Sequence, residues 1–368
     1  MTETIHNGAV FCVIGTRPEV IKLAPVVAAL QRRGVPVCVV GTGQHHNWQM
    51  MGAFIEQFGL RVDLQLVLER RDLLGSFVEI VSRLGAMFET HRPSMVLAVG
   101  DTTTVFASAL AGRKVGAAFG HVESGLRAFS RELPEEEHRI CSDALADLLF
   151  APTRIAVENL ARERVNGKVV LTGNPVLDAL RIHPPPVAAT REGILVTIHR
   201  QETVDDPAKL AQVFAALDVL GREHAVTWPV HPRSVAKARD AGLTFPSTID
   251  VCEPLGHTEF LARLASARLV VTDSGGVQEE SAILGTPCVT VRNNTERPET
   301  IAEGVGLLAV PESGAILAAV QHILGDWARF ARPVPHLYGD GRASEKIAQE
   351  CVEWLEAHGS HDLRRTAT

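Results

Sequence analysis

Short apolar runs rich in β-branched residues recur along the chain, and longer stretches with helical periodicity separate them. The runs lack a clean alternation of apolar and polar residues, which is typical of strands buried on both faces of a parallel sheet. Between them, stretches such as 19–32, 73–91 and 207–222 are amphipathic. Strand–helix alternation of this kind predicts a doubly wound α/β fold. The predicted strands are 10–15, 35–40, 95–99, 115–119, 169–171, 193–198, 225–230, 248–251, 269–272 and 288–291.

The length of 368 residues exceeds what one hydrophobic core usually serves, so we expect two domains. We predict an N-terminal Rossmann-like domain over 1–176 and a C-terminal one over 177–346. Residues 347–368 are predicted to form a C-terminal helix and tail that pack back on the first domain. Residues 181–193 contain three consecutive prolines, which is typical of a linker, although a surface loop within one domain gives the same pattern.

Composition and charge exclude several classes of protein. A formal net charge of −7 disfavours a nucleic-acid partner. The N-terminus has no apolar run of the signal-peptide kind, and no segment has eighteen consecutive apolar residues, so we expect neither secretion nor a membrane span. The six cysteines form no CxxC pair, which favours the reducing cytoplasm.

Polar, glycine-containing turns follow many of the predicted strands. Ligands of open α/β sheets bind beyond the carboxyl ends of the strands, so these turns are candidate binding loops. Four of them belong to the first half of the chain and three to the second, and a cleft between two domains would collect all seven. The turns are 15–17, 41–45, 100–104, 120–125, 199–200, 231–232 and 273–276.

Sequence signatures of common cofactors are missing. Neither GTRPEV nor GHVESG is a GxGxxG dinucleotide fingerprint, so no NAD is implied. The fifteen histidines show no HExxH or comparable ligand spacing, so no metal is implied.

Eleven motifs occur in the order seen in bacterial, non-hydrolysing UDP-N-acetylglucosamine 2-epimerases, which the chain therefore resembles over nearly its whole length. The resemblance implies the GT-B fold, two Rossmann-like domains with a cleft between them, and a homodimer. It also implies reversible epimerisation of UDP-GlcNAc at C2, which gives UDP-ManNAc without a cofactor. The motifs are GTRPEVIKLAPV, TGQH, GDTTT, HVESGLR, PEEEHR, LTGNPVLDAL, VTIHRQET, HP, TDSGGVQEE, GTPCV and TERPE.

The chemistry at C2 demands acids and bases, because the C2 proton is not adjacent to a carbonyl and its direct removal leaves an unstabilised carbanion. The family eliminates UDP to give 2-acetamidoglucal and then adds UDP back, which requires carboxylates to take and return protons. By resemblance the catalytic groups are Asp101, Glu123, Glu135 and His199. Asp101 could instead be a helix N-cap, and Glu135 a first-turn acid that complements the helix dipole. Glu123 has no comparable structural explanation.

The nucleotide is expected on TDSGG, where a strand ends, glycines allow close backbone approach, and a helix N-terminus favours an anion. A Ser-capped helix after a tight turn is the alternative for an isolated SGG. Glu280 is expected to bind the ribose, whereas the neighbouring Glu279 is expected to be a solvated helix residue. The other proposed UDP or sugar contacts are Arg17, Lys22, Arg139, His231, Ser274, Gly275, Gly276 and Arg297.

Bacterial members of the family often bind a second UDP-GlcNAc as an activator. The residues that correspond to this site are Gln44, His45 and Arg70. Asn47 and Arg71 stand where the family usually has Gln. Because Asn is one methylene shorter and Arg cannot accept a hydrogen bond, we expect activation to be weak.

Three alternatives remain open at this point. A hydrolysing 2-epimerase would release UDP and free N-acetylmannosamine, and a GT-B glycosyltransferase would need an acceptor. A non-enzymatic sensor of nucleotide sugars would have no reason to keep all four catalytic groups.

Overall fold

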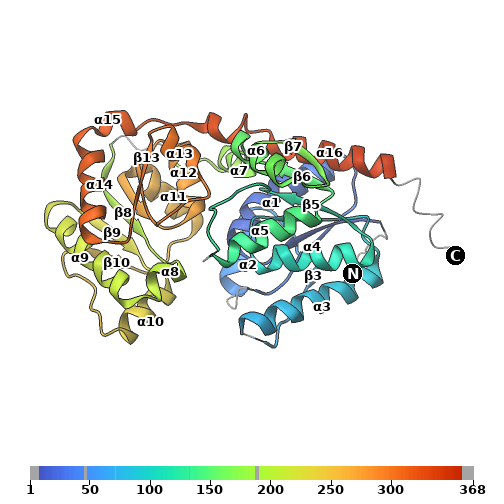
Figure 1. Cartoon of the computed structure of the whole chain (residues 1–368), viewed down its shortest axis with the longest axis horizontal. Helices are drawn as coiled ribbons and strands as arrows, with labels where there is room; N and C mark the ends of the chain where they lie inside the picture. The colour runs from blue at the N-terminus through green and yellow to red at the C-terminus, as the bar shows by residue number, and fades with distance from the viewer. Residues whose placement is uncertain (1–7, 45–47, 71, 132, 187–189, 359–368) are drawn as a thin grey trace. The chain divides into compact units, whose positions relative to one another are not determined.

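The structure, a computed structural model, describes residues 8–44, 48–70, 72–131, 133–186 and 190–358. It divides into two compact units, Met1–Ile182 with Tyr338–Thr368, and His183–Leu337 (Figure 1). Each unit holds one sheet in which every recorded strand pair is parallel. Both units are therefore α/β, as the sequence predicts.

The N-terminal unit has a seven-stranded sheet in the order β3-β2-β1-β4-β5-β6-β7. Its strands are β1 (Val10–Ile14), β2 (Val37–Gly41), β3 (Leu64–Gln65), β4 (Met95–Val99), β5 (Ala118–Val122), β6 (Leu148–Ala151) and β7 (Lys168–Leu171). Its helices are α1 (Arg17–Arg32), α2 (Trp48–Gln57), α3 (Leu73–His91), α4 (Thr103–Val115), α5 (Pro134–Leu145), α6 (Arg154–Glu163), α7 (Pro175–Ile182) and α16 (Ala343–His358).

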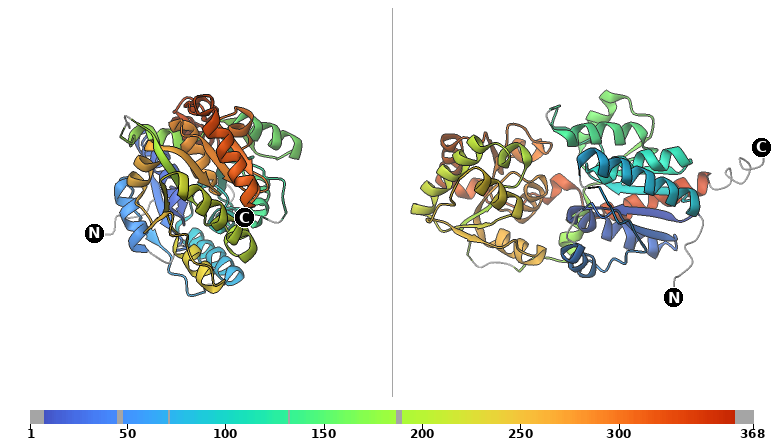
Figure 2. Two further views of the ribbon diagram at one scale, coloured as in Figure 1. Left: turned by 90° about the vertical axis from the view of Figure 1, so that its left-hand side faces the viewer. Right: turned by 90° about the horizontal axis from the view of Figure 1, so that it is seen from below.

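Alternate residues of the interior strand β1 belong to two different apolar cores. Val10, Cys12 and Ile14 pack with residues of α1 and α16, whereas Phe11 and Val13 pack with residues of α3 and α4. Helices accordingly cover both faces of this sheet (Figure 2). Burial on both faces explains why the strands read as continuous apolar runs.

The C-terminal unit has a six-stranded sheet in the order β10-β9-β8-β11-β12-β13. Its strands are β8 (Glu192–Thr197), β9 (Val226–Pro229), β10 (Asp250–Cys252), β11 (Ala267–Thr272), β12 (Cys288–Val291) and β13 (Gly306–Ala309). Its helices are α8 (Gln201–Val204), α9 (Pro207–Glu223), α10 (Pro232–Asp240), α11 (His257–Ser266), α12 (Gly275–Leu284), α13 (Pro298–Ala302), α14 (Ser313–Gly325) and α15 (Trp327–Phe330). The 3-10 turn η1 (Pro335–Tyr338) spans the end of this unit at Leu337.

The units divide later in the chain than the predicted boundary at 176/177. Helix α7 spans that boundary and packs on α1, while Asp178 accepts hydrogen bonds from the amides of Ala343 and Ser344 at the start of α16. The division therefore falls after Ile182, and the chain returns to the N-terminal unit at Tyr338, before the predicted position of 347.

One predicted strand, 115–119, is displaced. Helix α4 continues to Val115 and ends at Gly116, whose φ of 82° closes the helix, so that β5 begins only at Ala118. Strands β3, β6 and β13 are absent from the prediction, and each has no more than four residues. None of the helices within the described ranges combines the length and the apolar character needed to cross a membrane.

Each sheet has one point where the strand order reverses, and some of the candidate residues follow the strands at that point. In the N-terminal sheet β1 neighbours β4, and their carboxyl ends lead to Thr16 and Asp101. In the C-terminal sheet β8 neighbours β11, and their carboxyl ends lead to His199 and Asp273. Such topological switch points are the usual ligand sites of open α/β sheets.

Candidate active site

Asp101, which follows β4, is held by helix α5. The Arg139 guanidinium donates from Nη2 and Nε to Asp101 Oδ2, at 2.5 and 3.0 Å, and His138 Nδ1 lies 2.9 Å from the carbonyl oxygen of Asp101. The Asp101 side chain is 27% exposed, whereas Arg139 is buried. The carboxylate is thus oriented by a buried cation and still reaches solvent, as a group that exchanges protons with a ligand must.

Glu123, directly after β5, is buried and has a backbone φ of 67°. Its Oε1 accepts hydrogen bonds from Lys22 Nζ at 2.6 Å and from Asn174 Nδ2 at 2.7 Å. A left-handed backbone costs a residue other than glycine about 1–2 kcal/mol, and such strain concentrates at functional sites. Lys22 thus binds the Glu123 carboxylate in the structure, whereas the sequence analysis proposes that Lys22 contacts UDP or the sugar.

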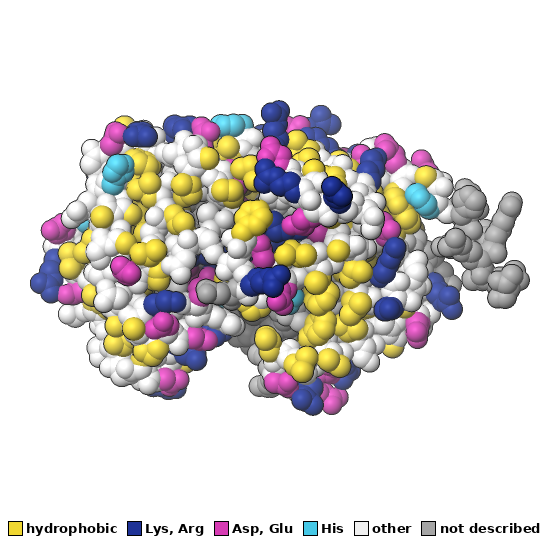
Figure 3. Space-filling view, viewed as in Figure 1, with side chains coloured by type: hydrophobic (Ala, Val, Ile, Leu, Met, Phe, Trp, Pro, Cys, Tyr) yellow, Lys and Arg dark blue, Asp and Glu magenta, His cyan; other side chains and the backbone are white. Residues whose placement is uncertain are grey.

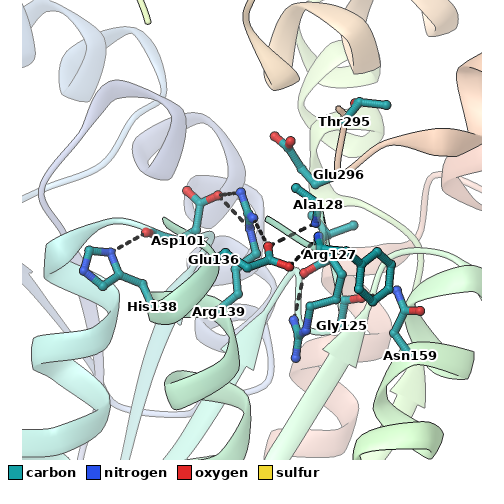
Figure 4. A network of polar contacts seen from close by, with 12 residues as sticks. Asp101, Gly125, Arg127, Ala128, Glu136, His138, Arg139, Asn159, Thr295 and Glu296 are labelled. Carbon is teal, nitrogen blue, oxygen red and sulfur yellow. Dashed lines mark hydrogen bonds and ion pairs between the residues drawn. The ribbon is translucent and has the colours of Figure 1, made fainter. Parts of the chain in front are cut away.

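The predicted acid Glu135 lies in the first turn of α5 and is partly buried. Its neighbour Glu136, which the sequence analysis did not single out, is buried and bonded to Arg139 Nη1 at 2.5 Å. Both residues are on the same helix turn as Arg139, but the recorded contacts to the Asp101 cluster come from Glu136 (Figure 4).

Glu19 joins the loops after β1 and β4. Its carboxylate accepts from the amides of Gly15 and Thr16, and Thr102 Oγ1 donates to it at 2.6 Å. Burial raises the pKa of Glu19 to about 7, against these hydrogen bonds, which lower it. At the first position of α1 the Arg17 guanidinium lies over the Phe54 ring, 5.4 Å from its centroid.

We predict that Glu19→Gln changes the pH dependence of stability. A folded-state pKa of about 7 against 4.5 in the unfolded chain means that wild type loses stability as pH rises through this window. The substitution should remove that loss, which is worth at most about 3 kcal/mol. Gln preserves the geometry because the Thr102 hydroxyl can accept from its amide. Urea unfolding of both proteins between pH 5 and 8 measures the difference, and parallel pH profiles would contradict it.

The residues predicted for an activator site are only partly described. Gln44 Oε1 accepts from the amide and the hydroxyl of Thr104, at 3.1 and 2.7 Å. Arg70 pairs with Asp72 at the exposed start of α3. His45, Asn47 and Arg71 lie outside the described residues, so the weakened activation stays a prediction.

The loop between β11 and α12 has the features of an anion site. Ser274 is the N-cap of α12, and its side chain makes no capping hydrogen bond. A Cβ on Gly275 would lie 2.7 Å from Glu296 Oε1, so that packing requires glycine there. A Cβ on Gly276 would meet only Ser274 Oγ, at 4.0 Å. Packing therefore does not explain Gly276, whereas backbone approach by a ligand does.

His199 is positioned by Asp273, a fully buried residue missed by the sequence analysis. Asp273 Oδ2 accepts from the amides of His199 and Arg200, at 2.9 and 2.8 Å. Its Oδ1 lies 3.3 Å from His199 Nδ1, and the His199 side chain is 42% exposed. His231 has its ring centroid 6.1 Å from that of His199, and its Nδ1 caps α10 by accepting from the amide of Arg233.

Glu280 and Glu279 are both buried on α12. Glu280 Oε1 lies 3.1 Å from Nε2 of His257, the first residue of α11. Glu279 accepts from Arg297 Nε at 2.8 Å, so the expectation of a solvated Glu279 is wrong. The reason is the short loop that carries Arg297 back over α12, which periodicity along one helix cannot reveal.

Arg297 is embedded in a buried ionic cluster. Besides Glu279 it binds Glu296 Oε1 through Nη1, at 2.6 Å, and Glu296 also pairs with Arg292 at 2.6 Å and Arg200 at 3.3 Å. At least two donors of Arg297 are thus used within the protein.

Over the described ranges, no group of three or more His, Cys, Asp or Glu residues is arranged to hold a metal ion.

The signals for the missed residues were partly present in the sequence. Asp273 stands within TDSGG and Glu136 within PEEEHR, so both belong to quoted motifs. Nothing in the sequence indicates that His257 contacts Glu280 or that Asn174 contacts Glu123. The two residues of each pair lie more than twenty positions apart.

Comparisons with known proteins agree on one family. A family model described as UDP-N-acetylglucosamine 2-epimerase matches residues 28–351. A UDP-N-acetylglucosamine 2-epimerase of Methanococcus maripaludis is 33% identical, with 91% of this chain and 96% of the relative covered. A UDP-2,3-diacetamido-2,3-dideoxy-D-glucuronate 2-epimerase of Pseudomonas aeruginosa is 35% identical, with 92% and 98% covered. The crystal structure of the Methanocaldococcus jannaschii UDP-GlcNAc 2-epimerase in complex with UDP-GlcNAc and UDP superimposes with a TM-score of 0.85, at 31% identity, and 94% of this chain and 99% of that one are covered.

Proposed function

The chain belongs to the UDP-N-acetylglucosamine 2-epimerase family, and from this premise we propose that it interconverts UDP-GlcNAc and UDP-ManNAc. The fold is GT-B, and the enzyme is an isomerase. The observation that carries the proposal is the set of acids, cations and glycine turns near the carboxyl ends of the strands in both sheets. The N-terminal unit supplies the carboxylates, and the C-terminal unit supplies the nucleotide-binding loop.

We assign the proton transfers at C2 to the N-terminal unit. In the forward direction a carboxylate takes the C2 proton, the C1–O bond breaks with its electron pair going to UDP, and a C1–C2 double bond forms. Protonation of the other face of C2 and re-addition of UDP give the epimer. Asp101 and Glu123 suit these steps because each is held by a cation, Arg139 and Lys22 respectively. We propose Glu135 as a further acid.

We assign UDP to the C-terminal unit. The uncapped N-terminus of α12 and Gly276 favour the diphosphate, and Glu280 suits the ribose hydroxyls as a buried acceptor. His199, exposed and held by Asp273, would stabilise the charge on the departing diphosphate when protonated. Arg17 and His231 remain proposed contacts of the nucleotide. We propose no NAD and no metal.

Incubation of the purified protein with UDP-GlcNAc alone in D2O tests the proposal. We expect UDP-ManNAc with deuterium at C2, observed by NMR, and no requirement for added NAD or metal. Retention of the original hydrogen at C2 would demand a hydride carrier and would overturn the mechanism. Stoichiometric release of UDP and free N-acetylmannosamine would instead identify the hydrolysing reaction, and no turnover without an acceptor would favour a glycosyltransferase.

A second sugar nucleotide is a specific candidate substrate. The relative from Pseudomonas aeruginosa, named for UDP-2,3-diacetamido-2,3-dideoxy-D-glucuronate, is 35% identical, whereas the UDP-GlcNAc 2-epimerase of Methanococcus maripaludis is 33% identical. Overall identity therefore does not separate the two substrates. Both reactions invert C2 of a UDP-2-acetamido sugar, so the same residues would serve. The ratio of kcat/KM for the two compounds, measured side by side, decides between them.

A homodimer and a cytoplasmic location are further proposals. Helix α3 exposes Leu73, Leu74 and Val78, at 74, 72 and 56%, and hydrophobic side chains gather over α3 and α4 (Figure 3). A second copy of the chain would cover this face, and sedimentation velocity measures whether the protein is a dimer. The free cysteines, among them the fully buried Cys12 and Cys351, support a reducing compartment.

A further inference from the structure

Glu136 is the meeting point of three donors from two parts of the N-terminal unit. Its Oε2 accepts from Arg139 Nη1 at 2.5 Å and from the amide of Ala128 at 3.0 Å, and its Oε1 accepts from the amide of Phe129 at 2.7 Å. The side chain is buried. Figure 4 shows the consequence, a chain of contacts that runs from the loop after β5 through Glu136 and Arg139 to Asp101.

The two ends of this chain have features that folding alone does not require. At one end, Phe129 has a backbone φ of 54° and a side chain that is 75% exposed, so neither conformational preference nor packing explains the residue. At the other end, Asp101 receives both Nε and Nη2 of Arg139 on one oxygen. Glu136 binds Nη1, the remaining nitrogen of the guanidinium, and thereby fixes the rotation of its plane.

We infer that Glu136 is a positioning residue, which orients the catalytic carboxylate of Asp101 through Arg139 and ties that orientation to the 128–129 loop. The inference rests on the proposed role of Asp101. Loss of the Glu136 contact to Nη1 would remove one constraint on the side-chain torsions of Arg139, and a rotation of the guanidinium would carry the Asp101 carboxylate with it. A displacement of about 1 Å at a reacting group can cost about 10²-fold in rate.

Substitution of Glu136 by Gln probes this role with little change in volume. Gln has one acceptor oxygen where three donors converge, so an amide N–H must face either Arg139 or the amide of Phe129. We expect kcat to fall about 10–10²-fold, while the KM for UDP-GlcNAc, set mainly by the C-terminal unit, changes little. The matched control is Glu137→Gln, which removes an equal charge from the exposed side of the same turn and should leave kcat unchanged.

A double-mutant cycle separates positioning from general loss of stability. If Glu136 acts through Arg139, the variant E136Q/R139Q has the kcat of R139Q alone, because the second substitution removes a contact already lost. If the two losses multiply instead, the inference is overturned. Circular dichroism and the unfolding midpoint establish that each variant is folded.

Arg139→Lys covers the case in which E136Q does not fold. One ammonium group cannot bind both carboxylates in the geometry of the guanidinium fork. We therefore expect kcat to fall in R139K by about the same factor as in E136Q. Wild-type kcat in a folded E136Q or in R139K contradicts the inference. Failure of the proposed function is distinguishable, because it appears as a wild-type protein that epimerises neither sugar nucleotide.

Discussion

Glu123→Gln should lower kcat by about 10²–10⁴-fold, because a general acid or base contributes about that much to a rate and an amide cannot take the C2 proton. The substitution retains the shape of the side chain, and its oxygen can still accept from Lys22 and Asn174, as Oε1 does in the wild type. Binding of UDP should be nearly unchanged. Initial rates, deuterium incorporation at C2 and calorimetric titration with UDP measure the three effects.

Loss of charge balance is the competing explanation for that result. Glu123→Gln leaves the buried Lys22 ammonium without its carboxylate, which destabilises the fold as well. The double variant K22M/E123Q removes both charges and should regain stability without regaining turnover. Recovery of turnover in the double variant would show that Glu123 serves to neutralise Lys22, and the catalytic assignment would be wrong.

The positions of the candidate residues along the chain were predictable because strand ends are predictable. Apolar runs buried on both faces locate most of the parallel strands, and in the structure Asp101, Glu123 and His199 each follow a strand within two residues. The run predicted before Glu123 ends at 119, whereas β5 continues to Val122. The rule that ligands gather at the carboxyl ends of strands marks the turns after these strands as candidate binding loops, whereas the catalytic roles of the three residues are inferred from the family resemblance. The order of the strands, which creates the switch points, was not predictable from those runs alone.

Which of two adjacent helix residues faces inward was the least predictable feature. Glu135 and Glu136 differ by about 100° around α5, and Glu279 and Glu280 differ likewise around α12. In the first pair, Glu136 makes the buried contact with Arg139. In the second, both are buried because separate elements cover them: α11 presents His257 to Glu280, and the loop before α13 presents Arg297 to Glu279. Tertiary partners, which no local pattern contains, decide these cases.

The domain boundary illustrates the same limit. The predicted boundary at 176/177 lies just after Pro175, since proline often marks a break between elements. Pro175 is instead the first residue of α7, and Asp178 on that helix binds the backbone at the start of α16, more than 160 positions later. A contact at that sequence separation is invisible to composition and periodicity.

Arg297→Ala should destabilise the C-terminal unit by about 3–5 kcal/mol in the absence of any nucleotide, since removal of one partner from a buried ion pair is strongly destabilising. The sequence suggests Arg297 as a UDP contact, but the structure commits its Nε and Nη1 to Glu279 and Glu296. A residue that served only to bind UDP would leave the unfolding of the free protein unchanged. Scanning calorimetry with and without UDP therefore separates the two roles.

Two further variants make the Arg297 experiment decisive. Arg233→Ala removes an ion pair between Arg233 and Asp205 in the same unit. These two side chains are 34 and 36% exposed, and such pairs contribute at most about 1 kcal/mol to stability. This variant is the control for loss of a surface arginine. R297A/E279Q removes the carboxylate that Arg297 Nε binds together with the arginine, so it should regain part of the lost stability. An R297A protein that unfolds at the wild-type temperature without UDP would contradict the structural role of Arg297. If the double variant is no more stable than R297A, the lost stability does not come from the contact with Glu279.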